Sequence, residues 1–303
     1  MPHLSLANIV NARALCGSLG GAVVATLCAL TFASPARAAF PGDDGRIGYA
    51  SVRHPVGNNC EESSPYDIFT IRPNGDGRTR LTRACATETY PSYSANGKRI
   101  VYTRNADIWM MHADGSNQHR VMNRHTNITD AAPAFSPNGR WIAWQRADDV
   151  MKMRTDGSDR QFLADGLHPS WSPDGDWIAY QSDDFDYDIW KMRPSGANQQ
   201  DLTANTIVEE QDPDWSPNGT EIAFFTNAAG NPNLDIAKFS ADGGTQTPLV
   251  NSAARELYPA YSPNGDRLAY SKEIDNRWHL LRTAPGDDLI LDTQGAAPSW
   301  QPR

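Results

Sequence analysis

Acidic residues recur at one fixed position of this sequence, three residues before a proline that opens each of six similar segments. The six positions hold Glu88, Asp130, Gly166, Glu210, Glu256 and Gly295, so four of them carry a carboxylate. Several carboxylates that converge on one point form the kind of site that a hard cation such as Ca²⁺ prefers. The structural alternative, which we favour, is that each acid accepts hydrogen bonds from the backbone of the adjoining segment and recurs because the segment recurs.

Two further residues extend this candidate binding site. His168 and Asp212 each stand directly before one of the recurring prolines. His54 and His125 could reach the same face of the molecule as His168, where three histidines would suit a transition metal or acid–base chemistry on a sugar acid. The sequence contains no closely spaced pair of histidines, so we expect these three to be incidental.

The densest acidic cluster is the run D-D-F-D-Y-D, which begins at position 183. Its carboxylates Asp183, Asp184 and Asp186 resemble the alternating ligands of a calcium loop, although the glycine and the distal glutamate of an EF-hand are missing. A solvated loop is the interpretation that we favour. Ca²⁺ is nevertheless the one cofactor that these acids would suit.

The prolines that organise these residues belong to a repeat of about 40 residues, a period typical of propeller blades when the segments have strand chemistry. The fullest copy reads H-P-S-W-S-P-D-G-D-W-I-A-Y-Q-S-D-D-F-D-Y-D-I-W-K-M-R and begins at His168. The copies open at Pro91, Pro133, Pro169, Pro213 and Pro259, and a truncated sixth copy opens at Pro298.

Each copy is predicted to form four antiparallel strands. In the fullest copy these are Pro169 to Ser172, Trp177 to Ser182, Asp188 to Arg193 and Gln199 to Thr203. The first two strands flank Ser-Pro-Asp-Gly, in which proline presets one corner of a tight turn and glycine accepts positive φ. The second and third strands are rich in aromatic and β-branched residues, as buried strands are.

The two ends of the chain together supply one blade. Residues 45–83 contain no P-x-W strand, whereas the last copy consists of that strand alone. Residues 45–83 plus 297–302 are therefore predicted to form a single blade, which removes the two free sheet edges of an open ring. The predicted fold is all-β, a six-bladed propeller of four-stranded antiparallel blades whose first blade is closed by the C-terminal strand.

Residues 1–38 have the composition of a secretory signal peptide. They contain two arginines and no acid, an apolar run from Ala22 to Phe32, and the small-x-small sequence Ala36-Arg37-Ala38. A membrane anchor is the alternative, but the apolar run is short of the roughly 20 residues that a spanning helix needs. We expect cleavage after Ala38, a mature propeller at 39–303, and a periplasmic or secreted bacterial protein without a membrane span.

The remaining chain is acidic. Without its first 38 residues it has 25 basic and 36 acidic residues, a net charge of −11. Nucleic-acid binding depends on basic charge, so nucleic acid is not an expected partner. Cys60 and Cys85 are the only cysteines left, and in an oxidising compartment they are predicted to form a disulfide worth about 3 kcal/mol, with two free thiols as the alternative.

The repeats resemble those of the TolB-like β-propeller family. Shared features are P-x-W-S-P-D-G, I-A-aromatic, D-I-aromatic as in Asp188-Ile-Trp190, and a terminal L-T as in Leu81-Thr82 and Leu202-Thr203. The resemblance implies the propeller fold. Family members that act in the Tol-Pal envelope system carry a separate α/β domain before the propeller, whereas only residues 39–44 lie between the expected cleavage site and the first blade, so we expect a free-standing propeller.

Function is expected on the loop-rich face, the end of the ring where the loops between second and third strands and the loops between blades emerge. This face gathers the variable insertions, at residues 53–66, 123–132, 183–187, 204–211 and 226–234. We expect a monomeric, non-catalytic propeller that binds a protein or cell-envelope component there. The alternative is a metal-assisted lyase or hydrolase acting on acidic saccharides, because the resemblance extends to propellers that act as uronate lyases with a histidine-held metal.

Overall fold

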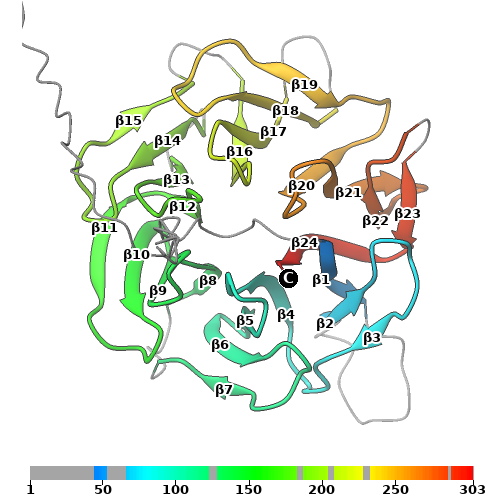
Figure 1. The fold of residues 1–303 in the computed structure, drawn as a ribbon, viewed down its shortest axis with the longest axis horizontal. Helices are drawn as coiled ribbons and strands as arrows, with labels where there is room; N and C mark the ends of the chain where they lie inside the picture. The colour runs from blue at the N-terminus through cyan, green and yellow to red at the C-terminus, as the bar shows by residue number, and fades with distance from the viewer. Residues whose placement is uncertain are drawn as a thin grey trace, which may run out of the picture. The chain divides into compact units, whose positions relative to one another are not determined.

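The computed structural model describes residues 44–52, 66–122, 128–182, 187–203, 208–227, 233–285 and 288–302. The secondary structure in these residues consists of β-strands, which form six sheets of four antiparallel strands each. The six sheets are arranged as blades around a central axis (Figure 1). The predicted six-bladed propeller is thereby confirmed.

Within each blade the strands are given from the axis outward. Blade 1 contains β24 (Gly295–Pro302), β1 (Asp44–Val52), β2 (Tyr66–Ile71) and β3 (Thr79–Arg80), and blade 2 contains β4 (Glu88–Tyr93), β5 (Arg99–Arg104), β6 (Asp107–His112) and β7 (His119–Arg120). Blade 3 contains β8 (Asp130–Phe135), β9 (Trp141–Arg146), β10 (Asp149–Arg154) and β11 (Gln161–Asp165), and blade 4 contains β12 (Leu167–Trp171), β13 (Ile178–Gln181), β14 (Ile189–Met192) and β15 (Gln200–Asp201). Blade 5 contains β16 (Glu210–Trp215), β17 (Glu221–Thr226), β18 (Asp235–Ser240) and β19 (Thr247–Val250), and blade 6 contains β20 (Glu256–Tyr261), β21 (Leu268–Ile274), β22 (Arg277–Arg282) and β23 (Leu289–Asp292).

Blade 1 is built from both ends of the described chain, as predicted. The innermost strand β24 pairs antiparallel with β1, with Ile47 opposite Trp300 and Gly48 opposite Ser299. The pairing is slightly longer than expected, because β24 begins at Gly295 and β1 at Asp44. The ring is therefore closed by hydrogen bonds between the beginning and the end of the propeller.

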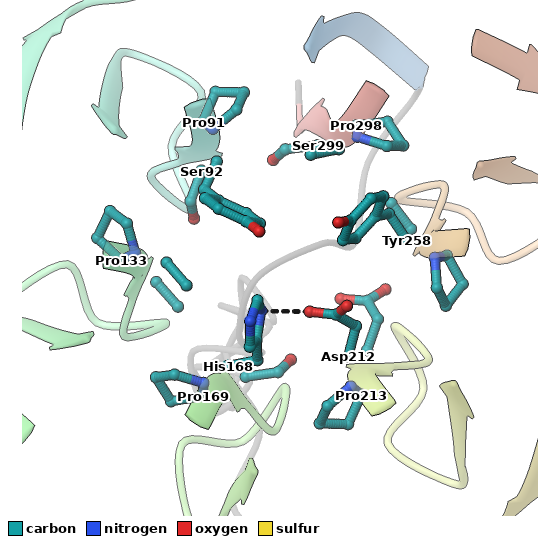
Figure 2. A pocket seen from close by; sticks show the side chains of 18 of the residues that line it. Pro91, Ser92, Pro133, His168, Pro169, Asp212, Pro213, Tyr258, Pro298 and Ser299 are labelled. Carbon is teal, nitrogen blue, oxygen red and sulfur yellow. Dashed lines mark ion pairs between the residues drawn. The ribbon is translucent and has the colours of Figure 1, made fainter. Parts of the chain in front are cut away.

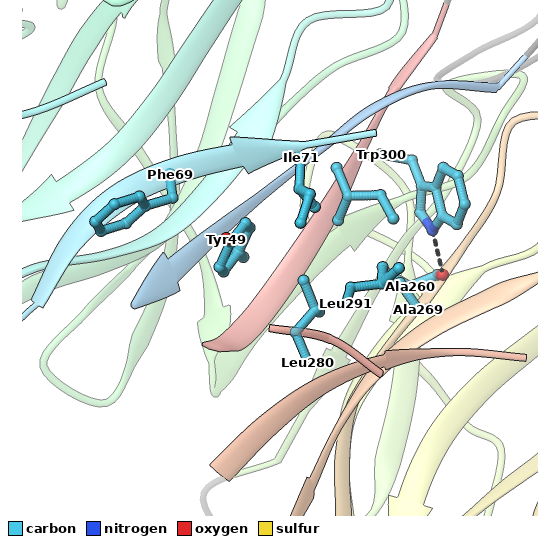
Figure 3. Close-up of a cluster of buried hydrophobic side chains, with 9 residues drawn as sticks. Tyr49, Phe69, Ile71, Ala260, Ala269, Leu280, Leu291 and Trp300 are labelled. Carbon is cyan, nitrogen blue, oxygen red and sulfur yellow. Dashed lines mark hydrogen bonds between the residues drawn. The ribbon is translucent and has the colours of Figure 1, made fainter. Parts of the chain in front are cut away.

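The hydrophobic core lies between neighbouring blades. At the junction of blades 6 and 1, Trp300 is 1% exposed and packs with Tyr49, Ile71, Leu280 and Leu291 (Figure 3). The indole Nε1 of Trp300 donates a hydrogen bond of 3.0 Å to the carbonyl of Ala260 in blade 6. Burying a large aromatic side chain supplies several kcal/mol, so this junction stabilises the closure strongly.

The Ser-Pro-Asp-Gly turns form as the sequence predicts. In blade 4 the Ser172 hydroxyl donates to Asp174 and accepts a 2.9 Å hydrogen bond from the backbone N–H of Trp177. Gly175 has a φ of 76°, which a residue with a Cβ rarely adopts. This local network fixes the register of the first two strands, so that each proline-containing inner strand is held in place beside the axis.

Candidate binding site in the central channel

Each inner strand contains a β-bulge at its proline. In β4, Thr89 pairs with Thr103 and Ser92 pairs with Val101. An advance of three residues along β4 therefore corresponds to an advance of two residues along β5, so β4 contains one extra residue. The inner strands of the other five blades show the same shift. A bulge accommodates proline, which has no N–H to give to the ladder. Because strand side chains alternate with a period of two, one extra residue reverses the side on which the preceding side chains lie.

The residue before each proline has a left-handed backbone conformation. The φ angles lie between 46° and 56° for six residues that we call the first tier: Tyr90, Ala132, His168, Asp212, Tyr258 and Ala297. Residues before proline ordinarily adopt extended conformations, and non-glycine residues at positive φ cost about 1 kcal/mol or more. The same strained conformation in all six blades places all six side chains around the axis.

A cavity of about 160 Å³ lies on the axis, lined by the first tier and by the six residues that follow the prolines. We call these the second tier: Ser92, Ala134, Ser170, Asp214, Ala260 and Ser299. The first tier carries four large polar side chains and two alanines, whereas the second tier carries mostly small side chains. The residues that line this cavity include no lysine or arginine.

Four first-tier side chains meet at the axis. The Nδ1 atom of His168 forms an ion pair with the Oδ1 atom of Asp212, and the two side chains are 20% and 14% exposed (Figure 2). The ring of Tyr90 packs edge-on against His168, with a centroid distance of 5.4 Å, and against Tyr258, with a centroid distance of 6.1 Å. These residues come from blades 2, 4, 5 and 6, so only closure of the ring brings them together.

The environment of the first tier raises the pKa of His168, Tyr90 and Tyr258. Burial lowers the pKa of His168, but the charge of Asp212 and its hydrogen bond outweigh burial, so the net shift is upward. Burial raises the pKa of Tyr258 to about 12, with the charge of Asp212 as the second cause. Burial raises the pKa of Tyr90 still further, with help from Tyr258 and Asp212. Both phenols are therefore neutral hydrogen-bond donors at physiological pH.

The second tier contains one ionisable carboxyl group. The Oδ2 atom of Asp214 accepts a 2.9 Å hydrogen bond from the backbone N–H of Tyr261 in the next blade. Ser299 occupies the equivalent position in blade 1 and accepts a 3.3 Å bond from the backbone N–H of Tyr93 in the same way. Burial raises the pKa of Asp214 to about 7, because a single backbone donor only partly compensates the lost solvation.

Of the six predicted binding residues, only His168 and Asp212 line the channel. The four acids three residues before the prolines lie inside the blades, because the bulge reverses their direction: Glu88, Asp130, Glu210 and Glu256 are each at most 1% exposed. A carboxylate ring around the channel mouth is thus not what the structure contains. Because these carboxylates are buried within the packed blades, each needs hydrogen-bond partners there. Their recurrence therefore fits a structural role that each blade repeats.

Side chains are among the partners of these acids. Arg104 Nε lies 2.5 Å from Glu88, and Trp144 Nε1 donates to Asp130 at 2.7 Å. Gln246 donates to Glu210 at 2.6 Å, and Lys272 Nζ lies 3.2 Å from Glu256. These contacts fit the structural role that we favoured from the sequence, and the expected hydrogen bonds from the backbone of the adjoining segment stay a prediction.

The other candidate ligands fall mostly outside the described residues. Asp183, Asp184 and Asp186 lie outside them, as do His54 and His125. Within the part of the chain that the structure describes, no three His, Cys, Asp or Glu residues form a group suited to a metal ion. Ca²⁺ binding at the 183–186 run remains a prediction.

The predicted disulfide and signal peptide also extend beyond the described residues. Cys85 is disulfide-bonded, whereas Cys60 lies outside the described ranges, so the pairing of the two remains a prediction. Residues 1–38 lie outside them as well. Among the residues that are described, no helix is long and apolar enough to cross a membrane.

Sequence reasoning missed Tyr90, Tyr258 and Asp214. All three flank a recurring proline, at the position directly before it or directly after it. The signal that could have found them is the chemistry of those two positions, which vary among the repeats while the neighbouring strand positions keep their type. A position whose residue type differs between the copies is not required for the fold of the repeat. Its side chain is therefore available for binding or chemistry.

A test of this geometry is the titration of His168. In the intact protein its imidazole should titrate above the ordinary histidine pKa of 6.5. Asp212→Asn removes the charge that raises the pKa and leaves burial, so we expect the pKa of His168 to fall below that value. NMR titration of the His168 ring protons measures the pKa of His168 in the parent protein and in the Asp212→Asn variant. Asp266→Asn, which removes an exposed carboxylate remote from the channel, is the matched control, and an equal shift in both variants would contradict the pairing.

No protein-family model matches the chain. Curated relatives match parts of it. The Tol-Pal system protein TolB of Francisella tularensis subsp. tularensis (strain WY96-3418) is 25% identical over 119 residues, which is 35% of this chain and 26% of that protein. The protein TolB homolog of Chlorobaculum tepidum is 31% identical over 88 residues, which is 28% of this chain and 20% of that protein. The chain therefore matches about a quarter of the length of these relatives.

Solved structures match most of the chain at low identity, which shows the fold. TolB from Acinetobacter baumannii has a TM-score of 0.72 and 19% identity, covering 87% of this chain and 68% of that one. An oligogalacturonate lyase in complex with manganese has a TM-score of 0.56 and 10% identity, covering 75% of this chain and 71% of that one. Similar propellers thus include at least one enzyme, so fold alone does not choose between binding and catalysis.

Proposed function

The chain is a TolB-like six-bladed β-propeller, and from that premise we propose that it is an exported protein that binds a protein or other component of the bacterial cell envelope without catalysis. The binding surface is the loop-rich face, and the compartment is the periplasm. The observation that carries the proposal is that sequence relatives and a structural neighbour covering most of the chain both bear the TolB name. The signal-like residues 1–38 support export.

The described part of the loop-rich face suits a polar partner. Its loops between second and third strands present Asn105 and Ala106 in blade 2, Asp148 in blade 3, and Asp275 and Asn276 in blade 6. The Asp148 and Asp275 side chains are exposed. Positive φ angles of 47° to 63° at Asn105, Ala106, Asp275 and Asn276 mark tight loops on a rigid ring. Rigid, charged loops give specificity at little entropic cost.

Charge reversal on this face tests the proposal. We expect the double variant Asp148→Arg and Asp275→Arg to reduce capture of its envelope partner by about thirtyfold, because a mismatched charge at the edge of an interface costs on the order of 1 kcal/mol per site. The measurement is quantitative cross-linking in the periplasmic fraction of the producing bacterium, read by mass spectrometry. Asp266→Arg, a reversal in a turn at the opposite end of the ring, is the control and should capture the partner as the parent does.

Two outcomes would contradict the proposal. Equal loss of capture with Asp266→Arg would mean that the loop-rich face is not the binding surface. Turnover of oligogalacturonate by the purified protein, followed as the ultraviolet absorbance of an unsaturated uronate and abolished by His168→Ala, would replace binding with lyase activity.

A further inference from the structure

The second tier of the channel holds a single carboxyl group among small hydroxyl-bearing and methyl side chains. Asp214 faces the same cavity as Ser92, Ser170 and Ser299, while Ala134 and Ala260 complete the tier. Four of the six side chains can thus accept a hydrogen bond, and the two alanines leave space. Neither the TolB likeness nor the loop-rich face accounts for this arrangement, which lies inside the ring.

The cavity offers acceptors and no fixed cation. Its lining contains Asp212 and Asp214 but no lysine or arginine, and the one imidazole, that of His168, is already paired with Asp212. Asp214 has only a backbone N–H as its described partner, at 2.9 Å. The hydroxyls of Ser92 and Ser170 make no hydrogen bond to any part of the chain that the structure describes. The polar groups that remain available in the second tier are a carboxylate oxygen and serine hydroxyls. Together they suit a positively charged group that donates hydrogen bonds.

We propose that the second tier binds the primary ammonium group of a small amine. An ammonium group has three N–H donors, and the second tier presents acceptors to the same cavity from Ser92, Ser170 and Asp214. A divalent metal ion would need several charged ligands converging on one point, and the second tier supplies only one. The cavity volume of about 160 Å³ limits the ligand to a few heavy atoms beyond the nitrogen.

Two further observations fit the proposal. The rings of Tyr90 and Tyr258 lie in the first tier of the same cavity, and aromatic faces attract organic cations. Burial raises the pKa of Asp214 to about 7, as expected for a carboxyl group that lacks a nearby cation. An ammonium group bound at Asp214 would favour the ionised carboxylate and so would replace the solvation that burial removed.

The test uses n-butylammonium chloride as the probe and the full mature protein, with binding followed by isothermal titration calorimetry and by NMR line broadening of the probe. We expect saturable binding of n-butylammonium and none of n-butanol, which has the same alkyl chain without the charge. Tetramethylammonium, which has the charge but no N–H, should bind at least about tenfold more weakly, since charge-assisted hydrogen bonds carry the affinity. Potassium chloride at equal ionic strength should not compete.

Asp214→Asn is the decisive variant. It keeps an oxygen that can accept from Tyr261, so the fold is preserved, and it should weaken n-butylammonium binding at least about tenfold. Asp266→Asn removes the same charge from the surface and should change binding less than about twofold. The proposal is overturned if n-butanol binds as well as n-butylammonium, if potassium competes fully, or if Asp214→Asn binds the probe like the parent protein.

Discussion

A chain that ends after Ala296 is expected not to fold. The deletion removes most of β24, the innermost strand of blade 1, and with it the pairs of Ile47 with Trp300 and of Gly48 with Ser299. It also removes Trp300, which is 1% exposed and donates a hydrogen bond to Ala260 in blade 6. Losing a buried tryptophan alone costs about 3–5 kcal/mol, and whole domains are stable by about 5–15 kcal/mol.

Trp300→Ala separates the loss of the side chain from the loss of the strand. We expect it to lower the free energy of unfolding by about 3–5 kcal/mol while the propeller still folds, as measured by urea denaturation followed by circular dichroism. Phe162→Ala is the control, because Phe162 is 55% exposed on the outermost strand of blade 3 and should change stability by less than about 0.5 kcal/mol. A truncated protein that melts like the intact one would show that ring closure does not hold the fold together.

The second large effect is expected in the pH dependence of stability. Glu88 is 0% exposed, and burial raises its pKa from 4.5 to about 7, although Thr82 and Arg104 act in the opposite direction and Asp67 adds to the rise. The folded state therefore keeps this proton up to a higher pH than the unfolded state does. Its stabilising contribution is complete below about pH 4.5 and is lost as the pH rises through about 7.

Glu88→Gln should remove this dependence. The glutamine is neutral at every pH and still offers an oxygen to Arg104, so the decline in stability between pH 4.5 and 7 should be smaller by about 3 kcal/mol than in the parent protein. Urea denaturation at a series of pH values measures the difference between the two proteins. Asp266→Asn controls for the loss of one surface charge. Parallel stability curves for the parent and Glu88→Gln would mean that Glu88 titrates alike in the folded and unfolded chains.

The repeat alone determined the fold. Proline, glycine and aromatic residues at constant offsets specify turns and strands locally, as the Ser172 to Gly175 turn shows. The same regularity reveals the missing inner strand near residue 45 and the surplus strand at Pro298, so the residue pattern is enough to assemble blade 1 from the two chain ends. Local sequence suffices here because each strand pairs with a neighbour only a few residues away, apart from the single closure.

Which side chains line the central channel was determined by the tertiary structure. A strand pattern without a bulge places Glu88, Tyr90 and Ser92 on one side, whereas the bulge turns Glu88 into the blade and leaves Tyr90 and Ser92 at the axis. The meeting of Tyr90 with Tyr258, from blades 2 and 6, depends on the radius and closure of the ring. Side-chain direction follows from hydrogen-bond register and from contacts between distant blades, and neither is encoded in the spacing of residues within one repeat.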